Sequence, residues 1–254
     1  VVYTASGRAF FGGRDTCGID INFYTLSRDN QPKKSIMVLV VGASGFMGRE
    51  VAKQLLSKNY QVRALVRTPS KVEDLKQLGA EIVQGDMIDA ESLKRACRGV
   101  TRVVATAHSL IGNGKYRSEA VDDIGNRNLI DAAKDAGVQH FIFASVSGAG
   151  PEHPIDFART KYAIEEYLKA SGMTYTIFRP TFFMEWHAHI FIGKSILETG
   201  KTRFLGTGTK LRNYIAVRDV AQFVLLALEK PAPMKALVRS RRALSKPSDG
   251  ASPC

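Results

Sequence analysis

Apolar runs of strand length alternate with segments of helical periodicity through residues 36–230. The first run, residues 36–41, is continuous and rich in valine, which is typical of a parallel strand covered on both faces. Apolar residues then recur at helical spacing up to residue 58, and a second apolar run occupies residues 61–66. This order predicts a βαβ unit at the start of the domain.

The same alternation continues to the end of this region. Strands are expected at residues 81–84, 102–107, 141–144 and 174–178. Helices are expected at residues 72–78, 90–98, 121–136, 159–170 and 221–228. Strands and helices in this order predict a doubly wound parallel sheet of the Rossmann-like α/β class, with right-handed crossovers.

The two ends of the chain lack this pattern. Residues 1–35 mix glycine, arginine, aspartate and scattered aromatic residues without periodicity, and residues 231–254 are rich in arginine, serine and proline. We therefore expect an irregular N-terminal extension and an irregular basic tail. Met37 directly precedes the core of the first strand, which raises the hypothesis that the natural chain starts there and that residues 1–35 are not native.

Three glycines, spaced three residues apart, follow the first strand and open the first helix. At this spacing the first glycine permits a tight turn, the second lets the backbone approach a pyrophosphate, and the third allows close helix–strand packing. The phosphates would lie at the helix N-terminus, where free N–H groups favour an anion. The expected contacts are Gly42, Ser44, Gly45, Phe46, Met47 and Gly48.

The second strand ends in Arg67 rather than in an acidic residue. A carboxylate at this position would bind the ribose hydroxyls of NAD, whereas an arginine can accommodate the 2′-phosphate of NADP. Lys71 would add a second positive charge. We therefore expect NADP rather than NAD, the alternative being that both side chains are ordinary solvated cations.

Two further strand ends should border the cofactor. Asp86 and Met87 follow the third strand, where the adenine would lie, although Asp86 could instead cap a helix or stabilise a turn. His108 follows the fourth strand and is either a proton donor or a loop residue. The fourth strand end also contributes Ala105, Thr106 and Ala107.

Composition narrows the functional classes. The chain has 254 residues, of which 44% are hydrophobic, as in a globular protein. Its net charge of +12 would suit nucleic acid, but no basic helix with interleaved aromatic residues is present, so nucleic-acid binding is not expected. No apolar stretch approaches the roughly 20 residues of a membrane span, and residues 1–35 lack the apolar core of a secretory signal. We expect a cytoplasmic protein.

The cysteines indicate neither a metal site nor a disulfide framework. Cys17, Cys97 and Cys254 are far apart and match no metal-ligand spacing. His187 and His189 are two residues apart, which directs them away from each other on a helix. We therefore expect no metal.

Several motifs together resemble one known family. They cover residues 36–230 and comprise the glycine triplet, Arg67, the Gly85-Asp86 turn and residues 144–147, 160–168, 178–181 and 213–221. With them the chain resembles the NmrA-like branch of the atypical short-chain dehydrogenase/reductases. That branch includes reductases of quinones and phenylpropanoids, redox-sensing regulators and assembly factors.

The resemblance implies roles for four residues. Lys161 would contact the nicotinamide ribose, and it would either serve as a general base, as in the phenylpropanoid reductases, or only hold the ribose hydroxyls. Ser145 and Ser147 match the position that orients a substrate carbonyl, with helix capping or small size as the alternative. Pro180 would border the cofactor.

The chain departs from the family in two respects. The usual catalytic tyrosine, four residues before the lysine, is replaced by Phe157, which cannot transfer a proton. Tyr162 lies about 100° round the helix from Lys161 and is a poor substitute. In addition, residues 231–254 show no strand pattern where the family completes its substrate lobe, so the lobe that begins at about residue 181 looks curtailed and the sheet edge exposed.

The resulting interpretation is an NADPH-dependent reductase that passes hydride to a quinone-like or conjugated carbonyl acceptor. Phe182, Phe183 and Trp186 would line an aromatic substrate pocket, or else belong to the core. Because Phe157 leaves it undecided whether the chain is an enzyme, a non-catalytic NADP-sensing regulator or assembly factor is the alternative. Its partners would be a small aromatic or quinone substrate, a protein, or a second copy of the chain.

Overall fold

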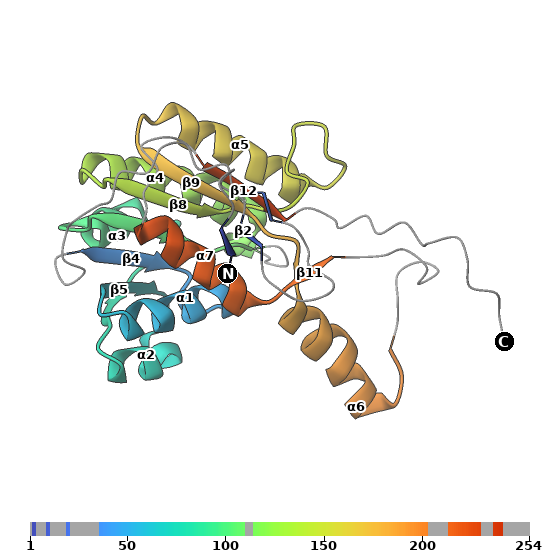
Figure 1. Cartoon of the computed structure of the whole chain (residues 1–254). Helices are drawn as coiled ribbons and strands as arrows, with labels where there is room; N and C mark the ends of the chain where they lie inside the picture. Colours follow the sequence, from blue (N-terminus) through green and yellow to red (C-terminus); the bar gives the residue numbers. More distant parts are fainter. Residues whose placement is uncertain are drawn as a thin grey trace.

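A parallel β-sheet forms the centre of the computed structural model, which describes residues 36–109, 114–202 and 213–229 and the backbone of four short strands outside them. The central strands are β4 Met37–Val41, β5 Gln61–Val66, β6 Glu81–Gln84, β7 Arg102–Ala105, β8 His140–Ala144 and β9 Thr174–Arg179. Neighbours in the order β6-β5-β4-β7-β8-β9 are parallel (Figure 1). The order reverses between β4 and β7, as in a doubly wound Rossmann-like sheet, so the predicted fold class is confirmed.

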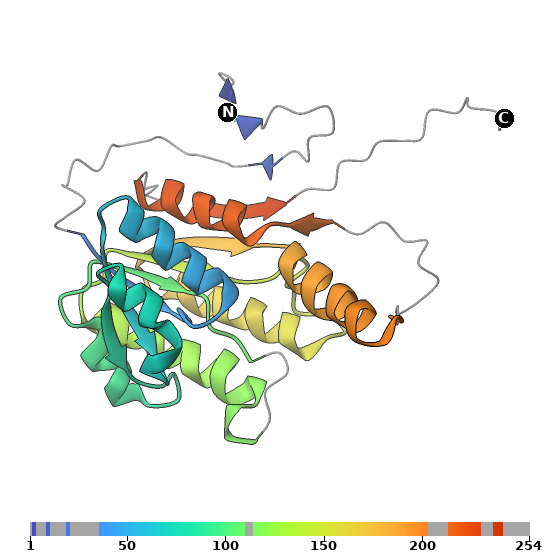
Figure 2. The same cartoon turned by 90° about the horizontal axis from the view of Figure 1, so that it is seen from below.

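Helices cover both faces of the sheet. They are α1 Phe46–Ser57, η2 Pro69–Val72, α2 Glu73–Gln77, α3 Ala90–Cys97, η3 Gly114–Tyr116, η4 Glu119–Gly125, α4 Asn126–Asp135, α5 Asp156–Ala170, η5 Trp186–Lys194, α6 Ser195–Thr199 and α7 Val217–Glu229. Figure 2 shows α1 and α7 side by side on one face and α3, α4 and α5 on the other.

Strand β4 explains the continuous apolar run in the sequence. Val38 and Val40 pack under α1 and α7, whereas Leu39 and Val41 pack under the helices of the opposite face. All four side chains are buried, because a central parallel strand has no face exposed to water.

One expectation for the ends of the chain is wrong. Ala236–Ser240 forms strand β12, which pairs in parallel with β9 and antiparallel with β3 (Ile19–Asp20), so residues 231–254 are not irregular throughout and the edge of β9 is not open. The edge of β9 offers unpaired backbone groups that a short apolar segment can satisfy, even one flanked by arginines. Short strands β1 Val2–Tyr3 and β2 Ala9–Phe10 also occur where none was expected. The rest of both ends lies outside the described residues.

Candidate functional site

The glycine turn lies at the point where the strand order reverses. Gly42 adopts φ +92°, and a Cβ atom there would lie 2.7 Å from the backbone nitrogen of Ala107. A Cβ atom on Gly48 would lie 2.3 Å from the carbonyl oxygen of Gly42, so α1 can approach the strand only without a side chain here. A Cβ atom on Gly45 would meet only the Gly42 carbonyl oxygen, at 3.3 Å. The turn and the close packing are thus visible, and Gly45 has room beside it for a phosphate.

The N-terminus of α1 is suited to an anion. Gly45 is its N-cap, so no side chain caps the first N–H groups, and no acidic residue lies in the first turn. Ser44 and Phe46 are exposed beside these groups, whereas Met47 is buried in the core and can offer a ligand only its backbone. Thr106 supports the turn from below, because its hydroxyl donates to the Val41 carbonyl at 2.8 Å.

Arg67 follows β5 and is exposed, but it is not an ordinary solvated cation. Its guanidinium carbon lies 4.3 Å from the centre of the Tyr116 ring, and the Nζ of Lys115 lies 5.0 Å from the same ring. Lys71 is also exposed, and its carbonyl accepts a hydrogen bond from the guanidinium of Arg49. Arg67 and Lys115 therefore share the Tyr116 ring near the end of β5, where a 2′-phosphate would lie. The contact of Lys71 is made by its backbone, so a role for its ammonium stays a prediction.

Asp86 does not cap the following helix. Asp89 is the N-cap of α3 and accepts from the backbone N–H groups of Glu91 and Ser92 at 3.1 and 3.2 Å. The carboxylate of Asp86 accepts a long bond of 3.4 Å from the Ile88 N–H, two residues on, which fits the alternative of a turn-stabilising residue. Among the described contacts this is its only bond, so it also keeps acceptor capacity at the predicted adenine position. Met87 is buried beside it.

Lys161 lies on α5 and is 2% exposed. Its Nζ is 3.4 Å from Oδ1 of Asp122, a residue of η4 that is fully buried, and it lies over the rings of Phe143 and Phe157 at 4.9 and 5.4 Å. Burial lowers the pKa of Lys161, and the attraction of Asp122 opposes this shift. The lowered pKa is what a lysine needs to exchange a proton near neutral pH.

Asp122 was missed in the sequence, where it reads as one acidic residue within a helical pattern. Its Oδ2 accepts from the Ser109 backbone N–H at 3.0 Å and from the Ser118 hydroxyl at 2.9 Å. Asn126 is buried next to it and donates to the carbonyls of Val121 and Asp122, across the π-helical turn η4. The signal available in the sequence was an acidic residue next to Val121, on the apolar side of the expected helix. The structure shows that both residues are buried.

The side chain of Ser145 joins a buried hydrogen-bond network. Its hydroxyl donates to Oε1 of Glu165 at 2.5 Å, and Glu165 forms a buried ion pair with Arg179. The proton of the Ser145 hydroxyl is therefore engaged by a core network, which makes Ser145 the weaker of the two candidates for orienting a substrate. Ser147 is exposed at the same strand end, and its N–H donates to the carbonyl of buried Pro180 at 2.8 Å. The substrate-orienting role stays a prediction for Ser147.

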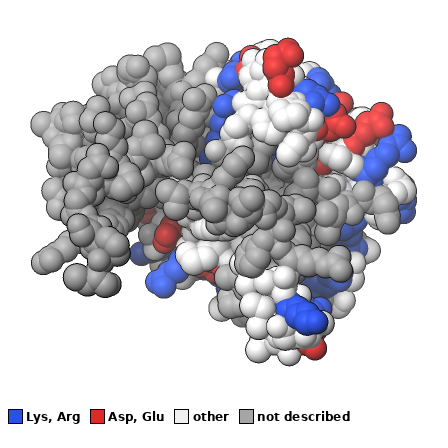
Figure 3. All heavy atoms as spheres, turned by 90° about the vertical axis from the view of Figure 1, so that its right-hand side faces the viewer, with Lys and Arg blue, Asp and Glu red and all other residues white. Residues whose placement is uncertain are grey.

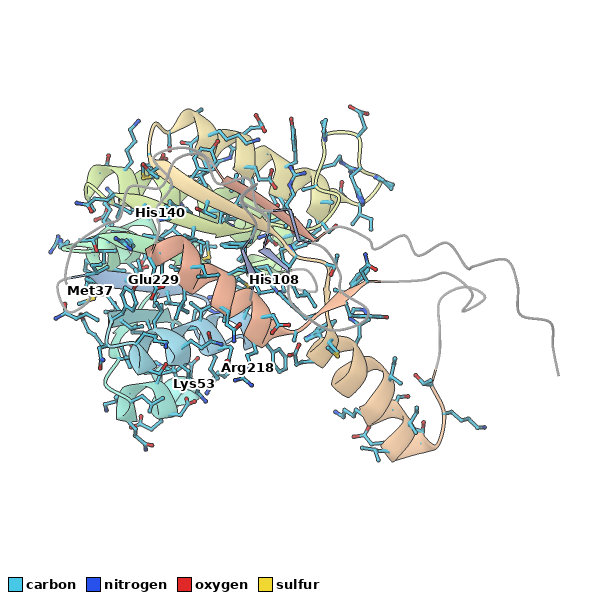
Figure 4. The ribbon with its side chains drawn as sticks, viewed as in Figure 1. Met37, Lys53, His108, His140, Arg218 and Glu229 are labelled. Atoms are coloured by element: carbon cyan, nitrogen blue, oxygen red, sulfur yellow. The ribbon has the colours of Figure 1, made fainter. Side chains whose placement is uncertain are left out.

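His108 lies at the carboxyl end of the sheet, on the side opposite to Met37 and His140 (Figure 4). Its ring meets Phe157 edge to face, with 6.0 Å between centroids. The protein atoms packed around the partly exposed ring lower its pKa, Lys161 lowers it further, and Asp122 opposes both. The neutral form of His108 therefore prevails at pH 7, so only a small fraction of the molecules carries the proton that a donor needs.

The substrate lobe carries a cluster of aromatic rings. Strands β10 Phe182–Phe183 and β11 Tyr214–Ile215 pair in parallel. The His187 ring meets Phe182 at 4.8 Å and Tyr214 at 5.2 Å, both at steep angles. Phe182 and Tyr214 remain 48% and 44% exposed, so the cluster presents apolar surface to solvent, whereas Phe183 packs against the core.

The visible surface carries charges of both signs. In the view of Figure 3, positive and negative side chains of the described residues are both present. Within the described part of the chain, no group of three metal-ligating residues occurs, and no helix is both long and apolar enough to cross a membrane.

A family model for NAD(P)H-binding proteins matches residues 42–231, which includes the glycine turn, Lys161 and the substrate lobe. The chain belongs to this NAD(P)H-binding family. Its fold is that of an atypical short-chain dehydrogenase/reductase. The crowded, uncapped glycine turn described above fits a dinucleotide, as the family requires.

This chain is similar to proteins that have different names and roles. Photosystem II assembly factor Ycf39 of Cyanophora paradoxa is 35% identical, with 75% of this chain and 59% of the relative covered. NAD(P)H azoreductase of Xenophilus azovorans is 31% identical, with 77% of this chain and 64% of the relative covered. The NADPH-dependent quinone oxidoreductase QOR2 of Escherichia coli is 25% identical with a TM-score of 0.63, covering 81% of this chain and 69% of that structure. The chain spans about 60% of the length of the assembly factors it matches.

Proposed function

We propose that this chain binds NADPH and reduces a flat, conjugated acceptor of the quinone or azo class. The observation that carries the proposal is the buried pair of Lys161 and Asp122 at the carboxyl end of the sheet. A lysine is almost never fully buried unless it is paired, as Lys161 is with Asp122, and its lowered pKa suits proton exchange near a reacting group. The nicotinamide would supply the hydride, and Lys161 would hold the ribose beside it.

NADPH is preferred in this proposal because of the charge at the end of β5. Arg67 and Lys115 flank the Tyr116 ring, and the described contacts around Arg67 include no carboxylate that would bind ribose hydroxyls instead. Asp86 retains acceptor capacity for the amino group of an adenine. Together they favour a phosphorylated adenosine.

The acceptor class follows from two features of the substrate side. Phe157 replaces the proton-donating tyrosine, which favours an acceptor that can take its proton from water or from Lys161. The exposed rings of Phe182 and Tyr214 offer a surface on which a flat aromatic molecule can stack. The similarity to an azoreductase and to a quinone oxidoreductase supports this choice.

A fluorescence titration with NADPH and NADH on the wild type and on Arg67→Ala tests the cofactor. We expect tighter binding of NADPH than of NADH and loss of this difference in the variant, because only NADPH carries the 2′-phosphate. Oxidation of NADPH should then be followed with a simple naphthoquinone and an azo dye. Lys161→Met should lower stability, because it leaves the buried Asp122 carboxylate without its counter-charge, and it should lose most of the turnover even when only folded protein that binds NADPH is assayed. Wild-type turnover in Lys161→Met would refute the proposed role.

Assembly or redox sensing is the second candidate, favoured by Phe157 and by the similarity to Ycf39. In that case a protein partner would read the NADPH-bound state. Tight NADPH binding without turnover of any quinone, enone or azo dye would favour it over the reductase.

A further inference from the structure

The two oxygens of the Asp122 carboxylate serve different parts of the site. Oδ1 faces the ammonium of Lys161 at 3.4 Å, at the end expected to hold the nicotinamide. Oδ2 accepts from the Ser109 N–H at 3.0 Å and from the Ser118 hydroxyl at 2.9 Å. One buried carboxylate therefore fixes both Lys161 and the residues on either side of Tyr116.

Tyr116 is anchored to this carboxylate from two sides. Ser118 follows it by two residues and bonds to Asp122 directly, and the Ser109 hydroxyl donates to the Tyr116 carbonyl. The half-buried Tyr116 ring is thereby placed against Arg67, with the guanidinium 4.3 Å from the ring centre. The segment from Tyr116 to Asp122 thus connects the Arg67 end of the site with the Lys161 end.

A guanidinium stacked on a ring is partly immobilised but keeps its charge and its N–H donors. A free arginine side chain loses rotational freedom when it binds a phosphate, and this loss weakens binding. A carboxylate partner would also immobilise Arg67 but would neutralise it and repel a phosphate. An aromatic partner avoids that repulsion.

We propose that Tyr116 is a specificity-determining residue for NADPH that acts through Arg67, and that Asp122 and Ser118 position it. The proposal rests on the proposed NADPH binding at Arg67. Because Tyr116 acts on the group that meets the 2′-phosphate, its effect should be confined to NADPH and spare NADH.

The test compares dissociation constants of NADPH and NADH, by fluorescence titration of the full chain, for Tyr116→Leu and Tyr116→Phe. Tyr116→Leu removes the ring and should lower the preference for NADPH about two- to fivefold, the size of an exposed cation–π contact. Tyr116→Phe keeps the ring and should keep the wild-type preference. Ser118→Ala removes one anchor but leaves the Lys161–Asp122 pair, and it should shift the preference in the same direction as Tyr116→Leu.

Arg67→Ala separates the failure of this inference from the failure of the proposed function. If Arg67→Ala leaves the preference unchanged, NADPH recognition at Arg67 is wrong. If Arg67→Ala abolishes the preference while Tyr116→Leu retains it, only the role of Tyr116 is refuted. If Tyr116→Leu weakens the binding of NADPH and NADH equally, the role of Tyr116 is merely structural and the proposal is refuted. If it tightens the binding of both, the ring occupies the place of the adenine and the proposal is refuted as well.

Discussion

His140 should make the fold sensitive to mild acid. It lies at the start of β8, 2% exposed, and its Nε2 is 2.9 Å from the Thr176 hydroxyl, whereas its Nδ1 is buried without a hydrogen-bond partner among the described groups. Burial, with the positive charge of Arg102 as a smaller cause, lowers the pKa of His140 from 6.5 to about 3. Protonation therefore places an unpaired charge in the core.

The free-energy cost follows from the two pKa values. Between pH 6.5 and about 3 the unfolded chain binds the proton and the folded chain does not, so stability falls as the pH falls through this window. Each pH unit costs about 1.4 kcal/mol. The expected loss in the free energy of unfolding is about 3 kcal/mol at a pH of about 4.5, and it approaches about 5 kcal/mol at a pH of about 3.

Urea unfolding followed by circular dichroism at several pH values measures this loss. In His140→Phe, which has no titrating group, the loss between neutral pH and a pH of about 4.5 should be smaller by about 3 kcal/mol. Thr176→Val is the matched control, because it removes the hydrogen-bond partner but keeps the histidine, and it should lose about 1 kcal/mol at all pH values. An identical pH dependence in the wild type and His140→Phe would refute the reasoning.

Three further comparisons between variants test the site. Gly48→Ala should lower the free energy of unfolding in urea by about 1–3 kcal/mol, because its Cβ would lie 2.3 Å from a carbonyl oxygen. Gly45→Ala, whose Cβ would lie 3.3 Å from the same oxygen, should keep its stability but bind NADPH more weakly in the titration. Equal unfolding midpoints for the two variants would contradict this. Glu165→Gln leaves buried Arg179 without its counter-charge and should lower the free energy of unfolding by about 3–5 kcal/mol. The same change at Glu166, which pairs with Lys169 at the surface, should lower it by less than about 1 kcal/mol. Similar losses in the two variants would argue against a buried ion pair. Ser147→Ala should lower quinone turnover at unchanged stability, whereas Ser145→Ala should lower the free energy of unfolding by about 1 kcal/mol. A loss of turnover in Ser145→Ala without a loss of stability would favour Ser145 as the residue that orients the substrate.

The strand ends around the expected cofactor site could be predicted from the sequence because their determinants are local. Each predicted contact follows directly from the end of its own strand, as Gly42 follows β4, Arg67 follows β5 and Asp86 follows β6. In a parallel sheet these ends meet at one edge whatever the details of packing. The fold and the NAD(P)H-binding family were therefore predicted correctly.

Strand β12 shows where a local pattern fails. Residues 236–240 contain a short apolar run among arginines, which alone does not predict a strand. The segment becomes one because β9 presents a complementary edge, and its register with residues 176–179 follows from that pairing. A strand of this kind depends on its neighbour rather than on its own propensity.

The chemical half of the site depends on packing between elements that are far apart in sequence. Lys161 and Asp122 belong to α5 and η4, and Ser145 is withdrawn from the site by Glu165 on α5. No spacing in the chain shows that Ser145 would donate inward while Ser147 stays exposed. The two halves should therefore respond differently to substitution. Changes at Arg67 should alter the affinity for one cofactor at constant stability, whereas changes in the buried networks should alter stability and both cofactors together. Loss of stability in Arg67→Ala would show that cofactor recognition and core packing are not separable in this way.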